Sequence, residues 1–146
     1  MTKTQILFVC IHNSARSVMA EAFVNSLLGD RFEAHSAGIE PGRLNPVVAQ
    51  AMSEIGLDVS NHQPQSVADV LARGDKFDLV ATVCDETSAE RCPVFPGQVK
   101  RLHMSFPDPS ALTGTPEEKL EGTRRIRDQI KAAILRDFDV VSALRG

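Results

Sequence analysis

The sequence predicts a single α/β domain over residues 1–146, a three-layer sandwich with a four-stranded parallel sheet between helices. Short, continuous apolar runs alternate with segments whose apolar residues recur at helical spacing. This alternation is typical of a parallel sheet with right-handed crossovers. A chain of 146 residues suits one hydrophobic core, and no internal repeat or linker divides it.

Four segments are expected to form the sheet. The first, Gln5-Ile-Leu-Phe-Val-Cys10, is a continuous apolar run of the kind that is buried on both faces of a parallel sheet. The second is closed by Ala37-Gly38, a small-residue punctuation. Strands are expected at residues 5–10, 32–36, 77–83 and 99–104.

Helices are expected between these strands and after the last one. From Ser17 the apolar residues recur at helical spacing, and Gly29 ends that helix. Pro46 suits the first turn of a second helix, which Gly56 stops. The stretch 115–118, Thr-Pro-Glu-Glu, begins the last helix with early acidic residues. Helices are expected at residues 17–28, 46–55, 66–72 and 115–138.

The composition is that of an ordinary globular protein, with 42% apolar and 24% charged residues. The net charge of −3 provides no broad basic surface for nucleic acid or an anionic membrane, so any anion must be bound by a local group of atoms. No apolar run is long enough to cross a bilayer, and Ile6–Ile11 is too short for a secretory signal. We therefore expect a cytoplasmic monomer without nucleic-acid or membrane partners.

The loop after the first strand is the candidate anion site. A short loop that leads into a helix directs several backbone N–H groups at one point, where the helix dipole adds positive charge. Arg16 offers a planar fork for two oxygens of a tetrahedral anion. The same field favours the thiolate of Cys10, to which Ser17 could donate a hydrogen bond. The expected substrate-binding residues are Ile11, His12, Asn13, Ser14, Ala15, Arg16 and Ser17.

Each of these residues also has an ordinary interpretation. Cys10 could be a small buried residue that ends a strand, and Arg16 could lie on a surface helix. A Cys followed by an Arg six residues later is a weak signal by itself. The position of the pair between a strand and a helix, together with Asn13 and Ser17, favours function. His12 is interpreted mainly as a loop side chain.

The stretch Cys10-Ile-His-Asn-Ser-Ala-Arg-Ser-Val-Met-Ala-Glu21 resembles the phosphate loop of low-molecular-weight protein tyrosine phosphatases and of the arsenate reductases that share their fold. It is most similar to the reductase branch. The matches run from residue 4 to about residue 135. They include Ser36-Ala-Gly-Ile39, Asn45-Pro46, Ser60-Asn-His62, Val83-Cys84 and Cys92-Pro93.

The resemblance implies arsenate as substrate and a relay of three thiols. Reduction of As(V) to As(III) takes two electrons, which two thiols supply by forming a disulfide. Cys10 is expected to attack arsenic, Cys84 to resolve the adduct, and Cys92 to take over the disulfide from Cys84. A redoxin would then reduce the exposed disulfide. The sequence does not choose between thioredoxin, mycoredoxin and glutaredoxin, and no bound cofactor is expected.

Cys84 and Cys92 have alternatives as well. Cys84 could be a core residue after the third strand, and Cys92 a loop thiol without a role. The three cysteines show no paired C-x-x-C spacing, so a zinc site is disfavoured and no metal ion is expected.

Asp108, in Phe106-Pro-Asp-Pro109, resembles the family's general acid, which protonates the departing oxygen. Its alternative is a turn aspartate before proline. The tyrosine phosphatases usually carry aromatic residues after this Asp-Pro pair, whereas Ser110 and Ala111 follow here. The chain also has no Tyr or Trp, which favours a small inorganic substrate.

Two departures and two rival functions complete the prediction. Ala15 stands where some relatives carry another cysteine. Gln65 stands where a carboxylate would complete a potassium site with Asn13, Glu21 and Ser36, so no bound cation is predicted. The nearest rival function is a tyrosine phosphatase with incidental cysteines, and a more distant one is a non-enzymatic oxyanion sensor.

Overall fold

The computed structural model describes residues 3–13, 15–83 and 100–145, with side chains in the last helix described up to Phe138. Its strands form one parallel sheet in the order β2-β1-β3-β4, which confirms the predicted fold class. The strands are β1 (Thr4–Cys10), β2 (Phe32–Gly38), β3 (Leu79–Thr82) and β4 (Lys100–His103).

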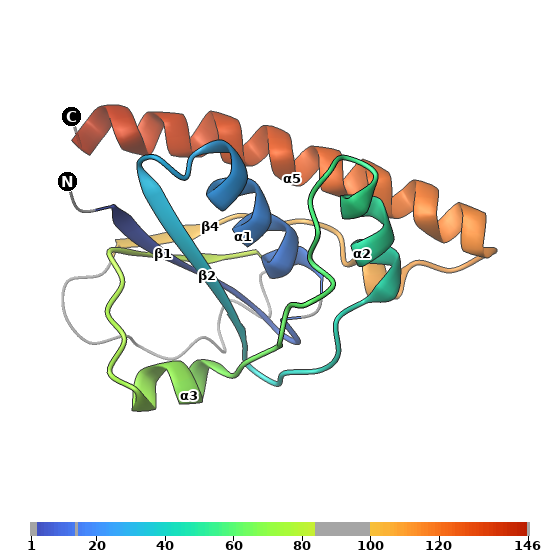
Figure 1. Cartoon of the computed structure of the whole chain (residues 1–146), viewed down its shortest axis with the longest axis horizontal. Helices are drawn as coiled ribbons and strands as arrows, with labels where there is room; N and C mark the ends of the chain where they lie inside the picture. The colour runs from blue at the N-terminus through green and yellow to red at the C-terminus, as the bar shows by residue number, and fades with distance from the viewer. Residues whose placement is uncertain (1–2, 14, 84–99, 146) are drawn as a thin grey trace.

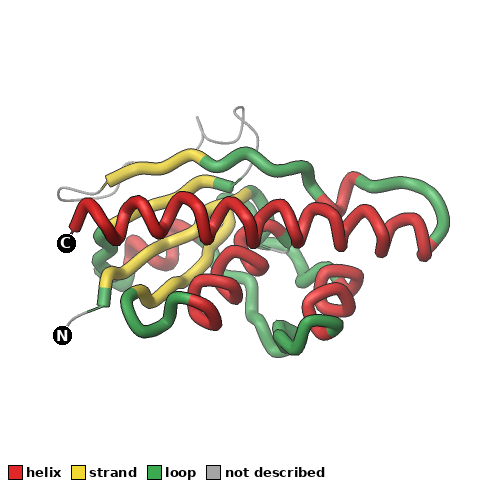
Figure 2. The backbone as a smooth tube through the Cα atoms, turned by 90° about the horizontal axis from the view of Figure 1, so that it is seen from above, coloured by secondary structure: helices red, strands yellow, loops and turns green. Residues whose placement is uncertain are grey.

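The helices cover the two faces of the sheet unequally (Figure 1). Their bounds are α1 (Arg16–Leu27), α2 (Pro46–Ser53), α3 (Val67–Ala72) and α5 (Pro116–Arg145), with a 3₁₀ turn, η1, at Pro109–Ala111. Helices α1, α2 and α5 pack on one face, and the long α5 runs across the strands (Figure 2). The short α3 lies on the opposite face, where it completes the third layer.

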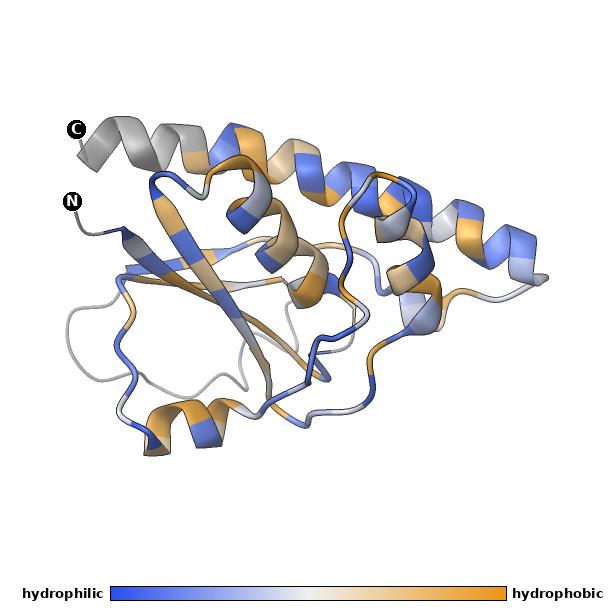
Figure 3. Ribbon diagram, in the orientation of Figure 1, coloured by the Kyte–Doolittle hydropathy of each residue, from blue (hydrophilic) through white to orange (hydrophobic). Residues whose placement is uncertain are grey.

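Apolar side chains form a core on each face of the sheet. The larger core includes the aromatic rings of Phe8, Phe32 and Phe138, whose edge-to-face contacts have centroid distances of 5.8 and 5.7 Å. The smaller core holds the apolar residues of α3, among them Val67 and Val70, which are 2% and 1% exposed. α3 combines apolar and hydrophilic residues along its short length, as Figure 3 shows, so one side of it suffices for this core.

The strand bounds differ from the predicted ones where pairing decides them. β2 continues through Ala37 and Gly38, because these residues pair with Val9 and Cys10 of β1. β3 begins at Leu79, two residues later than expected. The preceding residue, Asp78, is bonded to Gln5 twice: its backbone N–H donates to the Gln5 carbonyl at 2.8 Å, and its carboxylate accepts from the Gln5 backbone at 2.8 Å.

The position of β1 in the sheet determines where the site lies. β1 is a central strand with parallel neighbours on both sides, so its carboxyl end at Cys10 meets the carboxyl ends of β2 and β3. Among the described ranges, no helix has the length and apolarity that a transmembrane span requires.

A cluster of charged residues joins α2 to α5. Glu54, the C-cap of α2, accepts a hydrogen bond of 2.8 Å from Arg124 and one of 3.2 Å from Arg127. Arg127, which is 9% exposed, also donates to the carbonyl of Ala51 at 2.9 Å. The two guanidinium groups therefore tie the last turn of α2 to the long helix, and hydrogen bonds from Arg124 lower the pKa of Glu54 below its ordinary value of 4.5.

We predict that Glu54→Gln destabilises the protein in a pH-dependent way. Because the pKa of Glu54 is lowered in the folded state, its contribution is fully present above 4.5 and is lost as the pH falls through the folded-state value. Urea unfolding should show a deficit for the variant at neutral pH that shrinks in acid. Glu121→Gln, which removes only exposed contacts within α5, is the matched control. An equal deficit at both pH values would contradict the prediction.

Candidate functional site

The backbone of the loop after β1 is hydrogen-bonded to the segment that follows β2. The backbone N–H groups of Ile39, Glu40 and Gly42 donate to the carbonyls of Cys10, Ile11 and His12, at 3.0, 2.7 and 2.9 Å. In a trans peptide the N–H points away from the preceding C=O. The N–H groups of residues 11, 12 and 13 are therefore directed to the other side of the loop. The N–H groups of residues 11 and 12 and the start of α1 are the donors available to an anion, whereas the N–H of Asn13 is bonded to Cys10.

Gly38 makes this close approach possible. A Cβ atom at this position would lie 2.8 Å from both the backbone nitrogen of Asn13 and the carbonyl oxygen of Ile11. No side chain fits there without moving the loop backbone. The β2 strand thus forms the support directly beneath the candidate anion site.

Cys10 lies at the base of the loop and is 3% exposed. Its Sγ accepts a hydrogen bond of 3.1 Å from the backbone N–H of Asn13 and lies 2.9 Å from the hydroxyl of Ser17. Ser17 is fully buried in the first turn of α1. At the N-cap of this helix, Ala15 makes no side-chain capping bond. The helix N-terminus therefore faces the site without a protein cap from this residue.

The side chain of Asn13 determines which way the Ser17 proton points. The backbone N–H of Gln65 can only donate, so the Asn13 atom 3.2 Å from it is the amide oxygen. The amide nitrogen of Asn13 consequently faces Ser17 and donates to its hydroxyl at 2.9 Å. The hydroxyl proton is then available to the sulfur of Cys10. A sulfur with two donors is stabilised as the thiolate.

Asn13 also adopts an unusual backbone conformation, with φ of 51°. Asparagine tolerates this left-handed region better than most residues. The turn at this residue allows the Asn13 backbone to face Cys10 while its buried side chain faces the residues beneath the loop.

Three more side chains extend this network away from the nucleophile. His62 bonds to the amide oxygen of Asn13 through Nε2 at 3.0 Å, and this ring nitrogen must carry the proton because that oxygen only accepts. The other ring nitrogen of His62 lies 3.5 Å from the carboxylate of Glu21, which also accepts from the Ser36 hydroxyl at 3.2 Å. A chain of polar contacts therefore runs from Glu21 to Cys10.

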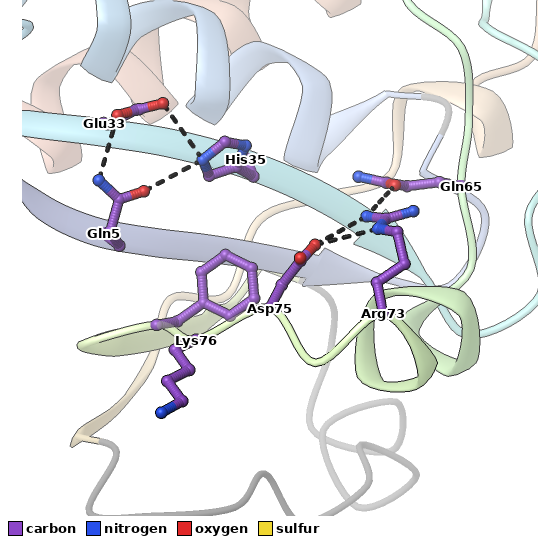
Figure 4. Close-up of a pocket in the computed structure, with 8 residues that line it drawn as sticks. Gln5, Glu33, His35, Gln65, Arg73, Asp75 and Lys76 are labelled. Atoms are coloured by element: carbon purple, nitrogen blue, oxygen red, sulfur yellow. Dashed lines mark hydrogen bonds and ion pairs between the residues drawn. The ribbon is translucent and has the colours of Figure 1, made fainter.

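Gln65 supports the network from the α3 side, as Figure 4 shows. Its side-chain amide donates to the carbonyl of Ser36 at 3.0 Å and accepts from Arg73 at 2.9 Å. Arg73 is in turn held by Asp75 at 3.0 Å. Gln65, Arg73 and Asp75 are among the residues that line a cavity of about 350 Å³ on the α3 face. None of the described residues of the anion loop lines this cavity.

The residues that resemble a potassium site do not fit one here. Asn13, Glu21 and Ser36 are bonded to protein partners, and Gln65 brings an amide where a carboxylate would be needed. The described residues contain no group of three or more His, Cys, Asp or Glu side chains suited to a metal ion.

Arg16 and Asp108 come together at the mouth of the loop. Arg16 is 5% exposed and donates to the carbonyl of Phe106 at 3.1 Å. Its other terminal nitrogen lies 3.7 Å from the carboxylate of Asp108. A cation for an oxyanion and a carboxyl group for proton transfer are thus adjacent.

The structure brings together most of the predicted site residues that it describes. Cys10, Asn13 and Ser17 are linked by hydrogen bonds, the neighbouring Arg16 contacts Asp108, and Ala15 is buried in the same loop. His12 is exposed, with its Nδ1 2.8 Å from the Glu40 carbonyl. Ser14, Cys84 and Cys92 lie outside the described residues.

Sequence reasoning did not assign a role to His62, Gly38 or Arg73. His62 lies in a segment that resembles the family, but its contact with Asn13 joins residues 49 apart in the chain. Gly38 closes a predicted strand and lies in the segment 36–39 that resembles the family, but neither observation predicted its close approach to the loop.

Comparison with known proteins agrees with this geometry. Residues 5–138 match the family model described as low molecular weight phosphotyrosine protein phosphatase. The chain belongs to this family. Within it, the chain is 44% identical over 126 residues to an arsenate reductase of Bacillus subtilis, covering 86% of this chain and 88% of that protein. The predicted resemblance to the reductase branch is confirmed.

Two solved structures of arsenate reductases are similar as well. One, from Archaeoglobus fulgidus, shares 34% identity with a TM-score of 0.64 and covers 88% of this chain and 98% of that one. A thioredoxin-dependent arsenate reductase of Corynebacterium glutamicum shares 26% identity with a TM-score of 0.61, and covers 92% of this chain and 63% of that one.

We predict that Gly38→Ala disrupts the loop, because its methyl group would overlap two backbone atoms. The expected cost is about 1–3 kcal/mol in the free energy of unfolding, with weaker binding of inorganic phosphate as an arsenate analogue. Gly42→Ala is the matched control, since its Cβ would lie at an ordinary 3.5 Å from His12. Equal phosphate affinity in the two variants would show that Gly38 is not needed for the loop.

We predict that Ser17→Ala raises the pKa of the Cys10 thiol, because the thiolate loses a donor in a buried site. The pH dependence of iodoacetamide alkylation at Cys10, followed by mass spectrometry, measures this shift. An unchanged profile would mean that the hydroxyl does not stabilise the thiolate.

Proposed function

We propose that this protein reduces arsenate to arsenite with electrons supplied by Cys10, Cys84 and Cys92. One observation carries the proposal: a buried cysteine with two hydrogen-bond donors lies at the base of an oxyanion loop. The arsenate reductases among its relatives support the choice of substrate. A phosphatase needs only one of these thiols, whereas the reduction needs an electron pair from two.

In the first step, the Cys10 thiolate attacks arsenic, and a hydroxyl group of arsenate leaves as water with a proton from Asp108. The N–H groups of the loop and Arg16 stabilise the charge on the remaining oxygens. The position of Asp108 beside Arg16 supports its role as proton donor. The product is a covalent adduct between Cys10 and As(V).

In the second step, the thiolate of Cys84 attacks the sulfur of Cys10. The sulfur–arsenic bond breaks, its electron pair stays on arsenic, and arsenite leaves. The residue before Cys84 supports this role, because Val83 donates a backbone hydrogen bond of 3.0 Å to Val9, the neighbour of Cys10. The described part of the chain therefore reaches Val83 beside the strand that ends at Cys10.

In the third step, Cys92 attacks Cys84, forms the Cys84–Cys92 disulfide and releases Cys10 as the thiolate. An external redoxin reduces this disulfide and completes the cycle. The thioredoxin-dependent relative makes thioredoxin the first partner to test, with mycoredoxin and glutaredoxin as alternatives.

We predict that Cys84→Ser abolishes arsenate turnover but retains hydrolysis of p-nitrophenyl phosphate, which needs Cys10, the loop and Asp108 but no second thiol. Cys92→Ser should permit one turnover and stop at a Cys10–Cys84 disulfide, which peptide mass mapping identifies. Arsenate turnover that persists in Cys84→Ser would overturn the relay.

Weak phosphatase activity is the second candidate function. The Cys10–Arg16 loop and Asp108 would also suit a phosphate monoester, because phosphate and arsenate have the same shape and charge. Ser110 and Ala111, in place of aromatic residues, offer no ring contact for a phosphotyrosine. We therefore expect turnover of activated small esters rather than of phosphotyrosyl proteins.

A further inference from the structure

A side-chain hydrogen bond joins the turn that carries Asp108 to the start of α2. The amide nitrogen of Asn45 donates to the hydroxyl of Ser110 at 3.0 Å. The backbone N–H of Ser110 in turn donates to the carboxylate of Asp108 at 2.9 Å. Asp108 is thus connected to a helix that is distant in the sequence and otherwise outside the site.

Asn45 is itself firmly oriented. It is the N-cap of α2, and its amide oxygen accepts from the backbone N–H of Val47 at 2.9 Å. Because this N–H can only donate, the amide nitrogen of Asn45 must face Ser110. Helix α2 is anchored by its buried residues Val48 and Met52 and by the hydrogen bond from Arg127 of α5 to the Ala51 carbonyl.

Pro109 in this turn is buried, but the Asp108 side chain itself has few other contacts. The Asp108 side chain is 34% exposed, and its contact with Arg16 is a long 3.7 Å. Asn45 and Ser110 both line a cavity of about 350 Å³ between their two segments. The segments are therefore not closely packed there, and the hydrogen bond is a specific connection between them.

We infer that Asn45 and Ser110 are positioning residues, which hold the Asp108 carboxyl group beside the Cys10–Arg16 loop. The inference rests on the proposed role of Asp108 as proton donor. A general acid acts only within hydrogen-bond reach of the departing oxygen, and a small displacement lowers the rate steeply. In this chain, the Ser110 hydroxyl accepts the hydrogen bond from Asn45, at a position where tyrosine phosphatases usually carry an aromatic residue.

Two variants remove the contact from either side. Ser110→Ala deletes the acceptor, whereas Asn45→Ser retains an N-cap but is too short to reach Ser110. Each should lower kcat for arsenate about tenfold, within the roughly 10²–10⁴-fold contribution of a general acid, with little change in KM. The double variant should lose no more than either single one. Ser110→Thr should retain activity, because it keeps the hydroxyl group. Ser53→Ala, at the other end of α2, is the control that should leave kcat unchanged.

Two readouts distinguish positioning from a general structural effect. In an Asp108→Asn background, Ser110→Ala should have no further effect on kcat. With phosphate monoesters, the loss should be larger for phenyl phosphate than for p-nitrophenyl phosphate, because the more basic phenolate depends more on protonation. Equal losses on both esters, or a full loss in the Asp108→Asn background, would overturn the inference.

The outcomes also separate this inference from the proposed function. A wild-type protein that hydrolyses both esters but does not turn over arsenate would overturn the reductase proposal, and the ester comparison would still decide the role of Asn45 and Ser110. A wild-type protein that turns over arsenate, with Ser110→Ala equally active, would overturn only the positioning. Inactivity toward arsenate and both esters would overturn both.

Discussion

The side-chain amide of Asn13 is the contact on which the rest of the site depends. It accepts hydrogen bonds from His62 and Gln65, donates to Ser17, and belongs to the residue whose backbone N–H points at Cys10. The backbone N–H of Gln65 fixes the orientation of the Asn13 amide. The amide therefore donates to Ser17, and the Ser17 hydroxyl can donate to the sulfur of Cys10. No buried side-chain nitrogen or oxygen among the described residues lacks a partner, so the nucleophile lies in a fully bonded environment.

Two separate supports meet at this site. The extension of β2 provides the loop with partners for its carbonyls, and Gly38 lets the two backbones touch. The hydrogen bonds between α2 and α5 act at a greater distance: they anchor the helix whose N-cap residue, Asn45, is bonded to the Asp108 turn. Cys10 and the proposed proton donor are therefore held by different parts of the fold, and Arg16 of the loop lies 3.7 Å from the Asp108 carboxylate.

The sequence predicted what local patterns encode. The apolar run before Cys10 and the helical spacing after Ser17 placed the anion loop between β1 and α1, and the alternation of elements indicated the parallel sheet. Contacts between distant segments were not predictable in this way. The extra residues of β2 depend on pairing with β1, and the role of His62 depends on a contact across 49 positions. The last helix continues to Arg145, beyond the expected Phe138, because the sequence has no glycine or proline there before residue 146.

The place of β1 in the middle of the sheet restricts how oxidation can leave the site. A strand bonded along both edges is held in place, so the sulfur at its end is held in place as well. In the proposed reduction, the oxidised state would then pass chemically from this stationary atom to groups on other parts of the chain. A reducing protein would then contact the final disulfide rather than the Cys10 sulfur. The anion pocket would not need to admit a second protein.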